Sequence, residues 1–398
     1  MSLEVHTLVT DDDVRAAGAL FRSAMVGLPP LPSHQEQLSE PGRTLGARID
    51  GELVGTAETY TSWLVVPGGA RVPHAAVTHV GVRPTHTRKG VLTALMRHQL
   101  DDIAARGEVL ATLRASEGVI YERFGYGVAT SFARLEVDRR RARLRDGVPE
   151  SGPVRFVESD EAWKLLAQIY TESGVSWTGA IDRPDYWWRQ QRLMTPELSY
   201  TVVHGISGAE DGFLRYHPVD TAGWFTSSER TIVVDDFVAT TPDAYRGLLR
   251  HLLAIDLVDK IVIAFAPLDS PLRHLLADER AVRVAAIRDE TWLRIIDVPE
   301  ALAQRTYRAG PPVVVEVLDA LRTANTGRYR VSADGVARVA DPADITVDVA
   351  ALAAVYLGGS SWYELGLGGR AVEQRRGALA AADELFATPS LPFSGTFF

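Results

Sequence analysis

Val77-Thr78-His79-Val80-Gly81-Val82-Arg83-Pro84-Thr85-His86-Thr87-Arg88-Lys89-Gly90-Val91-Leu92-Thr93 combines the pattern of a β-strand with a basic, glycine-containing turn and the first turn of a helix. In that order, the free backbone N–H groups of the helix start and the positive end of its dipole point at one spot. A phosphate or pyrophosphate is the group that such a spot binds. An ordinary surface turn before a basic helix start is the alternative interpretation.

The turn has neither the GxxxxGK[ST] pattern of a P-loop nor the GxGxxG pattern of a dinucleotide fold. It resembles the acyl-CoA pyrophosphate loop of the GNAT acetyltransferase superfamily, which runs Gln/Arg-x-x-Gly-x-Gly/Ala. Gly90 is kept, whereas Thr87 and Leu92 depart from the pattern at its two ends. The resemblance implies acetyl-CoA as co-substrate, with the pantetheine amide on the backbone of Val80, Gly81 and Val82, and the pyrophosphate on Arg88, Lys89, Gly90, Val91, Leu92 and Thr93.

A second segment, Ala115-Ser116-Glu117-Gly118-Val119-Ile120-Tyr121-Glu122-Arg123-Phe124-Gly125-Tyr126-Gly127, resembles the later GNAT element in which a tyrosine precedes a Gly-aromatic pair by four residues. Aminolysis of a thioester expels a thiolate, and a phenol at the sulfur can protonate it. Tyr121 fits that role, with Ser116 and Glu117 near the cofactor. The pKa of a free thiol is about 8.5 and that of tyrosine about 10, which predicts a nearly balanced transfer. Tyr126 is the alternative tyrosine, interpreted as a packing residue.

The whole chain narrows the resemblance. The strings SEGxIYxRFGYG and VxPTHxRxG occur together with the ending Leu391-Pro392-Phe393-Ser394-Gly395-Thr396-Phe397-Phe398 in a chain of 398 residues. This combination resembles the Eis (enhanced intracellular survival) family of actinobacterial N-acetyltransferases. The resemblance implies that the α-carboxylate of Phe398 is the general base and that the protein is a homohexamer. Most chain ends are frayed, but this chain end is apolar, and exposing it to water would be unfavourable.

The expected organisation is α/β and α+β, in three domains. Residues 1–146 form a catalytic GNAT domain, 147–288 a degenerate GNAT-like domain, and 289–398 a sterol-carrier-like α+β domain that delivers the C-terminal carboxylate. In the first domain the patterns predict a helix over Asp11–Met25 with Thr10 as N-cap, and a helix over Lys89–Ala104. They also predict strands over Thr44–Ile49, Leu53–Tyr60, Ala75–Val82 and Val109–Arg114, and a short helix over Ile120–Phe124.

The second domain contains an internal repeat of the Val77–Thr93 pattern at an offset of 157 residues, which aligns Gly90 with Gly247. Tyr245 stands where Arg88 stood, Asp243 adds negative charge, and no counterpart of Tyr121 follows the next strand, Lys260–Ala266. We interpret this as a GNAT-like unit that has lost CoA binding; chance similarity of two βα units is the alternative. In the third domain we expect four short strands and two helices, over Val313–Ala320, Gly327–Val331, Val336–Val339, Ile345–Asp348, Val349–Leu357 and Arg370–Phe386.

Composition restricts the chemistry. The chain has no cysteine, which excludes disulfides, thiolate metal sites and a Cys acyl-enzyme, so acetyl transfer must be direct. The net charge of −9 argues against nucleic acid and suits a cationic amine. The ten histidines show no metal spacing, so we expect no metal. The basic run over residues 139–145 is either a nucleic-acid patch or, as we favour, a solvated helix end or an interdomain salt-bridge surface.

No apolar run approaches the ~18 residues of a membrane span, and the N-terminus does not have the pattern of a secretory signal. We therefore expect a cytoplasmic protein, with non-classical export left open. The expected activity is N-acetyl transfer to amines, either aminoglycoside-like polyamines or lysine ε-amino groups, although the expected rim of the acceptor pocket, Phe21–Gly27, contains no acid. A non-catalytic module that senses CoA or lipid is the alternative function.

Overall fold

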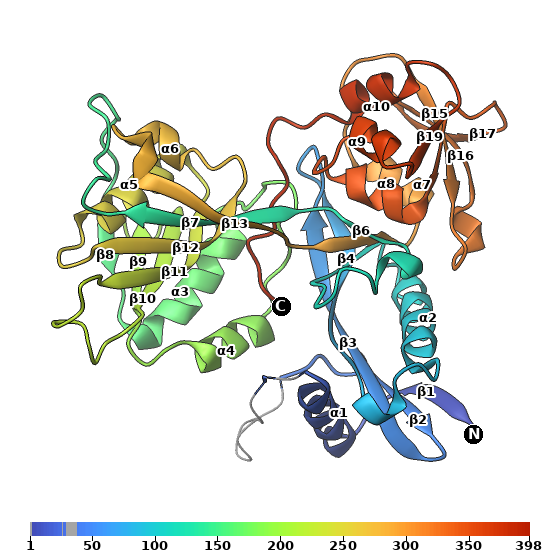
Figure 1. Cartoon of the computed structure of the whole chain (residues 1–398), viewed down its shortest axis with the longest axis horizontal. Helices are drawn as coiled ribbons and strands as arrows, with labels where there is room; N and C mark the ends of the chain where they lie inside the picture. Colours follow the sequence, from blue (N-terminus) through green and yellow to red (C-terminus); the bar gives the residue numbers. More distant parts are fainter. Residues whose placement is uncertain (1, 26, 29–37) are drawn as a thin grey trace. The chain divides into compact units, whose positions relative to one another are not determined.

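The computed structural model describes residues 2–25, 27–28 and 38–398 (Figure 1). Contacts between Cα atoms divide the chain into two compact units, the first formed by Met1–Thr130 together with Glu290–Phe398 and the second by Ser131–Asp289. None of the helices in the described part of the chain is both long and apolar enough to cross a membrane.

The first unit contains a seven-stranded sheet with the order β1-β2-β3-β4-β5-β14-β6. The strands are β1 (Leu3–Thr7), β2 (Thr44–Ile49), β3 (Glu52–Val65), β4 (Arg71–Val82), β5 (Leu110–Leu113), β14 (Trp292–Ile295) and β6 (Tyr126–Val128). The predicted strands of this region are confirmed, although β3 and β4 are longer than predicted. The short helix predicted over Ile120–Phe124 is only a 3-10 turn, η2 (Glu122–Phe124), because Gly125 in the left-handed region ends it.

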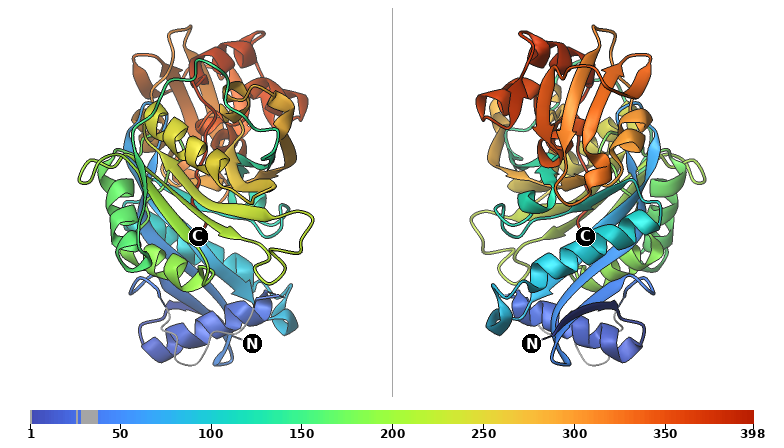
Figure 2. Two further views of the ribbon diagram at one scale, coloured as in Figure 1. Left: turned by 90° about the vertical axis from the view of Figure 1, so that its left-hand side faces the viewer. Right: turned by 90° about the vertical axis from the view of Figure 1, so that its right-hand side faces the viewer.

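Two helices cover opposite faces of this sheet. The helix α1 (Asp11–Ala24) begins where predicted, since the Thr10 side chain accepts the Asp13 N–H, and α2 (Val91–Ala105) follows the quoted turn. A Cβ at Gly81 would contact Phe21 of α1, whereas a Cβ at Gly55, paired with the next residue of β4, would contact α2. Consecutive residues of a strand face opposite sides, so the sheet is sandwiched between the two helices. Figure 2 shows α2 lying along the strands.

The second unit has its own seven-stranded sheet, ordered β13-β7-β12-β11-β10-β9-β8. Its strands are β7 (Ser131–Asp138), β8 (Val154–Phe156), β9 (Tyr200–His204), β10 (Gly212–Pro218), β11 (Thr231–Ala239), β12 (Lys260–Pro267) and β13 (Val282–Asp289). Its helices are α3 (Ser159–Glu172), α4 (Asp185–Met194), α5 (Pro242–Ala254) and α6 (Leu272–Leu275). Because β7 pairs with β12 and β13, the contacts divide after Thr130, not after residue 146 where we placed the domain boundary.

The C-terminal region adds a five-stranded sheet, β17-β16-β15-β18-β19, to the first unit. Its strands are β15 (Val313–Leu318), β16 (Gly327–Ser332), β17 (Gly335–Val339), β18 (Ile345–Asp348) and β19 (Ala371–Glu373), and its helices are α7 (Val298–Gln304), α8 (Val349–Tyr356), α9 (Trp362–Leu367) and α10 (Ala378–Phe386). The single helix predicted over Arg370–Phe386 is wrong. Its first part pairs as β19 with β18, and Gly377 starts α10.

The helix α8 joins the two sheets of the first unit. All of its residues are buried, and it packs against β6 and β14. A Cβ at Gly127 would lie 2.1 Å from the Ala350 carbonyl oxygen, so only glycine permits this approach. Beside it, Arg294 of β14 forms a buried ion pair of 2.8 Å with Asp319. The glycines of the FGYG string therefore permit the close approach of α8.

Candidate active site

Within the described residues, β4 lacks a paired strand on one edge near its C-terminal end, which forms an opening in the sheet of the first unit. The parallel pairing of β4 with β5 begins at His74 and ends at Val77, opposite Leu113. Beyond that point β4 pairs only with β3, where the Arg83 N–H donates to the Val54 carbonyl oxygen. Backbone groups of alternate residues point to the same edge, so Gly81 is directed to β3 while Val80 and Val82 are directed to the open edge. The Gly81 backbone is therefore not free for pantetheine as we expected.

The start of α2 provides unsatisfied backbone donors next to that opening. Gly90 is the N-cap residue, in the left-handed region at φ 81°, and no side chain caps the helix. The first helical hydrogen bond runs from the Ala94 N–H to the Gly90 carbonyl oxygen. The N–H groups of Val91, Leu92 and Thr93 precede that bond and have no acceptor within the helix. These are the donors that the sequence pattern predicted for a pyrophosphate.

Two cations of the turn accompany these donors. Arg88 and Lys89 are exposed, and among the described residues neither forms an ion pair. Arg88 also has a left-handed φ of 61°. Thr87, which departs from the superfamily pattern, donates its hydroxyl to the Pro84 carbonyl oxygen at 3.2 Å and so closes the turn. The change at residue 87 alters a side chain while the backbone donors stay in place.

Tyr121 lies at the beginning of η2, with 6% of its surface exposed. Burial, and next the nearby charge of Glu117, raises the pKa of its phenol to about 12. The phenol is therefore protonated at neutral pH, as a general acid must be. Free-solution pKa values suggested a nearly balanced proton transfer from the phenol to the thiolate, but the transfer in this site is uphill. A thiol pKa of about 8.5 lies well below that of Tyr121, so full proton transfer would cost about 5 kcal/mol.

The alternative tyrosine is part of the core. Tyr126 is fully buried, and its ring meets that of Tyr121 edge-on, with centroids 6.0 Å apart. Its hydroxyl finds no hydrogen-bond partner in the described residues, and burial raises its pKa. This agrees with the interpretation of Tyr126 as a packing residue. Ser116 and Glu117 lie in the exposed loop after β5, so their side chains are open to solvent.

The end of the chain lies against the same sheet. The ring of Phe398 meets Tyr60 of β3 at right angles, with centroids 5.7 Å apart. Phe398 is half-buried, and its ring contacts that of Tyr60. The preceding residue, Phe397, is 56% exposed, and the Arg114 guanidinium lies 4.8 Å from its ring centroid. The apolar tail thus belongs to the first unit, which also contains β4 and Tyr121.

A histidine–carboxylate pair at the opening escaped the sequence interpretation. His79 has a left-handed φ of 49° at an irregularity in the pairing of β3 and β4, a backbone state that is enriched at functional sites. Its Nδ1 lies 2.7 Å from Oε2 of the buried Glu58, and its ring packs 4.7 Å from that of Phe21. A carboxylate that holds one ring nitrogen leaves the other for proton exchange. The strand pattern in the sequence does not indicate that His79 contacts Glu58, which lies much earlier in the chain.

The expected rim of the acceptor pocket is described in part. Phe21 and Ala24 of α1 face Gly81, which places this end of α1 against the open part of β4. Val26, within the same expected segment, lies outside the described residues. The rim that is described therefore presents an aromatic ring to His79, consistent with the absence of acids noted in the sequence.

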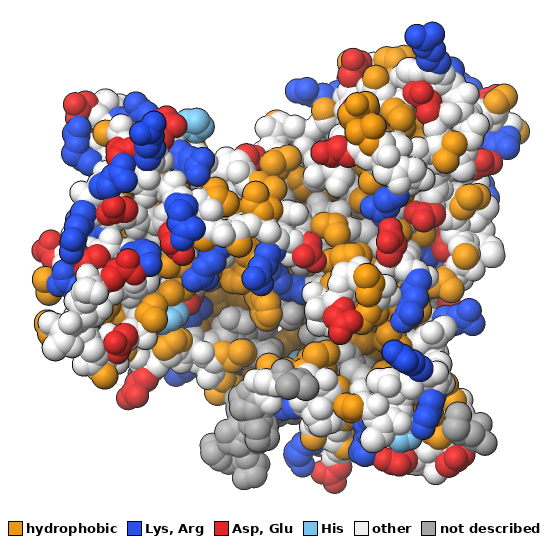
Figure 3. All heavy atoms as spheres, viewed as in Figure 1, with side chains coloured by type: hydrophobic (Ala, Val, Ile, Leu, Met, Phe, Trp, Pro, Cys, Tyr) orange, Lys and Arg blue, Asp and Glu red, His pale blue; other side chains and the backbone are white. Residues whose placement is uncertain are grey.

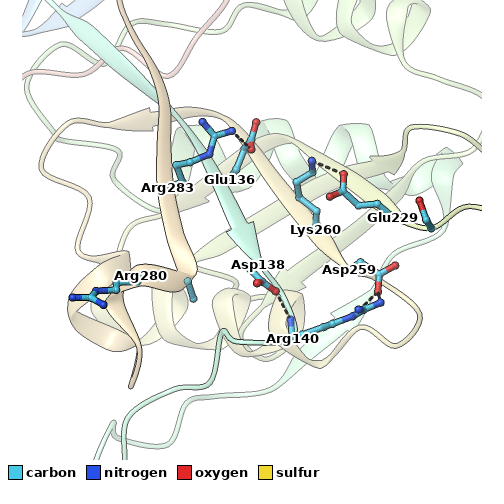
Figure 4. A pocket seen from close by; sticks show the side chains of 10 residues that line it. Glu136, Asp138, Arg140, Glu229, Asp259, Lys260, Arg280 and Arg283 are labelled. Atoms are coloured by element: carbon cyan, nitrogen blue, oxygen red, sulfur yellow. Dashed lines mark hydrogen bonds and ion pairs between the residues drawn. The ribbon is translucent and has the colours of Figure 1, made fainter.

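The second unit contains a polar cavity of about 410 Å³ that differs from this site (Figure 4). It lies at the ends of β7 and β12, and several of its charges are paired within its walls, as in Arg140 with Asp259 at 2.6 Å and Arg283 with Glu136 at 2.5 Å. Figure 3 shows charges of both signs interspersed over this unit. Arg140, Arg141, Arg143 and Arg145 of the basic run all pair with acids of the same unit. The run is a salt-bridge surface, and its ion pairs lie within the second compact unit.

Comparison with known families agrees with this architecture. Residues 6–129 match an acetyltransferase (GNAT) domain family, and residues 179–295 match another. Residues 298–395 match a sterol carrier protein domain family. The order of the three matches follows the order in which we expected the domains.

The chain is also similar to proteins that are named N-acetyltransferases. The N-acetyltransferase Eis of Mycobacterium tuberculosis is 35% identical over 325 residues, which covers 79% of this chain and 78% of that protein. An uncharacterised N-acetyltransferase of Streptomyces coelicolor is 36% identical over 99% of both chains. The crystal structure of Eis1 from Mycobacterium abscessus is 51% identical and superposes with a TM-score of 0.94 over both whole chains. A GCN5-related N-acetyltransferase from Anabaena variabilis, at 19% identity and TM-score 0.85, shares the fold.

Proposed function

Because the chain belongs to the Eis family of GNAT N-acetyltransferases, we propose that this acetyltransferase moves the acetyl group of acetyl-CoA directly to an amine. The observation that carries the proposal is the uncapped start of α2 beside the open edge of β4. The N–H groups of Val91, Leu92 and Thr93, with Arg88, Lys89 and Gly90, would hold the pyrophosphate. The backbone of Val80 and Val82 would pair with the pantetheine amide, and Ser116 and Glu117 would border the cofactor.

We propose Tyr121 as the general acid. The amine nitrogen attacks the thioester carbon, the C–S bond breaks, and the thiolate takes the phenolic proton or a hydrogen bond from it. The raised pKa of Tyr121 supports the protonated starting state. It also means that the bound cofactor must place the thiolate close to the phenol, because the developing negative charge is stabilised only at hydrogen-bond distance.

We propose the α-carboxylate of Phe398 as the general base. A free α-carboxyl group has a pKa of about 3.5, so it is ionised at neutral pH and can accept the ammonium proton during attack. The packing of Phe398 on Tyr60 supports a defined place for this residue. The imidazole of His79, whose Nδ1 lies 2.7 Å from the Glu58 carboxylate, is a second candidate for the base beside β4. Deletion of Phe398 and His79→Gln therefore form the pair of variants that assigns the base.

The acceptor we propose is a small cationic amine, either an aminoglycoside-like polyamine or a lysine ε-amino group. The net charge of −9 favours a cation over an anion. The family resemblance supports a homohexamer that works in the cytoplasm, where acetyl-CoA is available. Light scattering coupled to gel filtration measures the first property, and fractionation of cells measures the second.

The test is release of CoA thiol from acetyl-CoA in the presence of a panel of polyamines and lysine peptides. Turnover with one of them supports the enzyme, whereas acetyl-CoA binding without turnover favours the alternative sensing module. Deleting Phe398, or adding a C-terminal tag, should lower turnover about 100-fold or more, since about 1 Å of misplacement costs that much. An N-terminal tag is the control. A folded, C-terminally tagged protein with full activity removes the carboxylate from the mechanism.

A further inference from the structure

The tail of the first unit is held by a carboxylate that the proposed chemistry does not use. The side chain of Glu290 is fully buried. Its Oε2 accepts the Ser394 N–H at 2.8 Å and its Oε1 accepts the Gly395 N–H at 2.9 Å. Two successive backbone donors on the two oxygens of one carboxylate fix both the position and the orientation of the chain. The tail has no helix or strand to do this, because residues 387–398 are irregular.

Two further side chains complete this tail clamp. The Thr130 hydroxyl donates to Oε2 of Glu290 at 2.9 Å. The Arg114 guanidinium lies 3.7 Å from Oε1, and its Nη1 also donates to the Thr396 carbonyl oxygen at 3.0 Å. A buried carboxylate is tolerated only with such partners. Here the donors come from three places in the chain: the end of β5, the residue before β7, and the tail itself.

The clamp leads directly to the last residue. Arg114 contacts the Phe397 ring as well as Thr396, and Phe398 then packs on Tyr60. Ser394 and Thr396, on either side of the gripped Gly395, are buried. Contacts thus run without interruption from Glu290 to the terminal ring, although no contact joins Glu290 to Phe398 itself.

We propose that Glu290, supported by Thr130 and Arg114, is the positioning residue that aims the terminal carboxylate of the chain. This inference rests on the proposed function, because a precisely held tail matters to turnover only if its carboxylate takes part. Glu290 acts through the tail and does not touch the substrate. A flexible tail would bring the carboxylate to the reacting amine only part of the time, whereas the clamp keeps it in one place.

Glu290→Gln tests the clamp with the smallest change of shape. The amide keeps one acceptor oxygen but turns an N–H₂ group toward a backbone N–H, so one of the two grips is lost. We expect kcat to fall about 10- to 100-fold with the KM for acetyl-CoA unchanged. The matched control is Glu108→Gln, which alters a 5% exposed carboxylate of the same unit, paired with Arg43 at 2.9 Å. The control should lose stability and keep kcat.

Two readouts separate positioning from mere stability. In a protein that already lacks Phe398, Glu290→Gln should lower kcat no further, because both changes act through the same group. A carboxypeptidase that prefers aromatic ends should release Phe398 faster from the Glu290→Gln protein than from the wild type or the control. If Glu290→Gln does not fold, Thr130→Val, which removes one donor at nearly constant shape, should give the same pattern with a smaller loss.

The failures are distinguishable. Wild-type kcat and unchanged carboxypeptidase release in the Glu290→Gln protein, with an inactive Phe398 deletion, would overturn the clamp and leave the base assignment intact. Full activity of the Phe398 deletion would overturn the base assignment. A loss of kcat by Glu290→Gln that persists in the deletion background would show that Glu290 acts by a route other than the tail.

Discussion

In both units a helix begins after a strand whose parallel pairing ends at an equivalent position, yet only the helix in the second unit is capped by a side chain. Parallel pairing ends at Val77 in β4 and at Val234 in β11, positions separated by the sequence offset of 157. The helix α2 then begins uncapped at Gly90, whereas Thr241 caps α5 with its side chain, followed by Pro242 and Asp243. Proline has no N–H, and an acid satisfies the positive end of the helix. The fold provides the geometry, but the chemistry of the first helical turn decides whether an anion binds.

The second unit also carries aromatic rings at positions where the first unit has Val80 and Arg88. Phe237 and Tyr245, which stand at the positions of Val80 and Arg88, place their rings 5.1 Å apart between β11 and α5. Tyr245 directs its hydroxyl to Ser270 at 3.3 Å. This packed ring pair agrees with our interpretation of the second unit as degenerate.

The largest expected difference between the units is catalytic. Tyr121→Phe should lower turnover roughly 10²- to 10⁴-fold at unchanged acetyl-CoA affinity, the range for one acid–base group. Tyr245→Phe, in the second unit, should leave turnover unchanged. Because the pKa of Tyr121 is raised to about 12, its proton is retained throughout the usual assay range, so its titration should not limit turnover below about pH 10. Steady-state thiol release measures the turnover of both variants and its pH dependence. If Tyr121→Phe kept wild-type turnover while Tyr126→Phe lost it, Tyr126 and not Tyr121 would be the general acid.

Next in size is the helix start itself. Gly90→Glu should weaken acetyl-CoA binding about 100- to 1000-fold, since it strains a residue at positive φ and puts a carboxylate at the phosphates. Crowding is not the reason, because a Cβ at Gly90 would meet nothing within 4 Å. Calorimetry measures the affinity, and it should find one CoA site per chain.

The matched control is Gly377→Glu. Gly377 is also the N-cap of a helix, at φ 83° and with equally open space, but the N–H of Leu379 is already taken by Glu373. This variant should carry the strain and keep the affinity. Gly247→Glu is a poorer control than its sequence position suggests, because its Cβ would lie 2.4 Å from the His204 ring. An equal loss of affinity in Gly377→Glu would contradict a phosphate site at α2.

The exposed cations should contribute less. Lys89→Ala should weaken acetyl-CoA binding about 10-fold, an effect that shrinks in high salt because the charge is exposed and screened. Arg246 stands at the equivalent position of the second unit but is paired with Asp243 at 3.0 Å. Arg246→Ala should therefore leave the affinity unchanged. Acetyl-CoA titrations at two salt concentrations measure both affinities. An equal loss of affinity in Lys89→Ala and Arg246→Ala would contradict the proposed difference between the two units.

The smallest expected effect is on stability. Thr241→Ala removes the cap of α5, whose side chain accepts the Ala244 N–H at 3.0 Å, and should lower the free energy of unfolding by about 1 kcal/mol. The uncapped helix should still not bind CoA, because Pro242 and Asp243 remain. Urea unfolding followed by circular dichroism measures the first result, and calorimetry the second. Gain of a second CoA site would show that the cap alone had closed it.

Several features of the site were readable from local sequence. Short-range patterns predicted β4, the turn and α2, because strand period, helix caps and positive-φ glycines depend on neighbours within a few residues. The same holds for the change of chemistry at Asp243 and for Tyr121. The balance of proton transfer at Tyr121 was misjudged, since its pKa depends on burial, which comes from residues elsewhere in the chain.

What only the tertiary structure decided are the contacts between residues far apart in sequence. Glu290 meets a donor 104 residues later, and Arg114 meets the Thr396 carbonyl oxygen 282 residues later; the pair of His79 and Glu58 depends on the register of two strands. The boundary at Thr130 and the docking of α8 on Gly127 have the same origin. Local sequence determined the turn before α2 and its uncapped helix start, because backbone conformation is set by nearest neighbours. It could not determine the clamp on the tail, because a buried carboxylate acquires its partners only when distant segments pack.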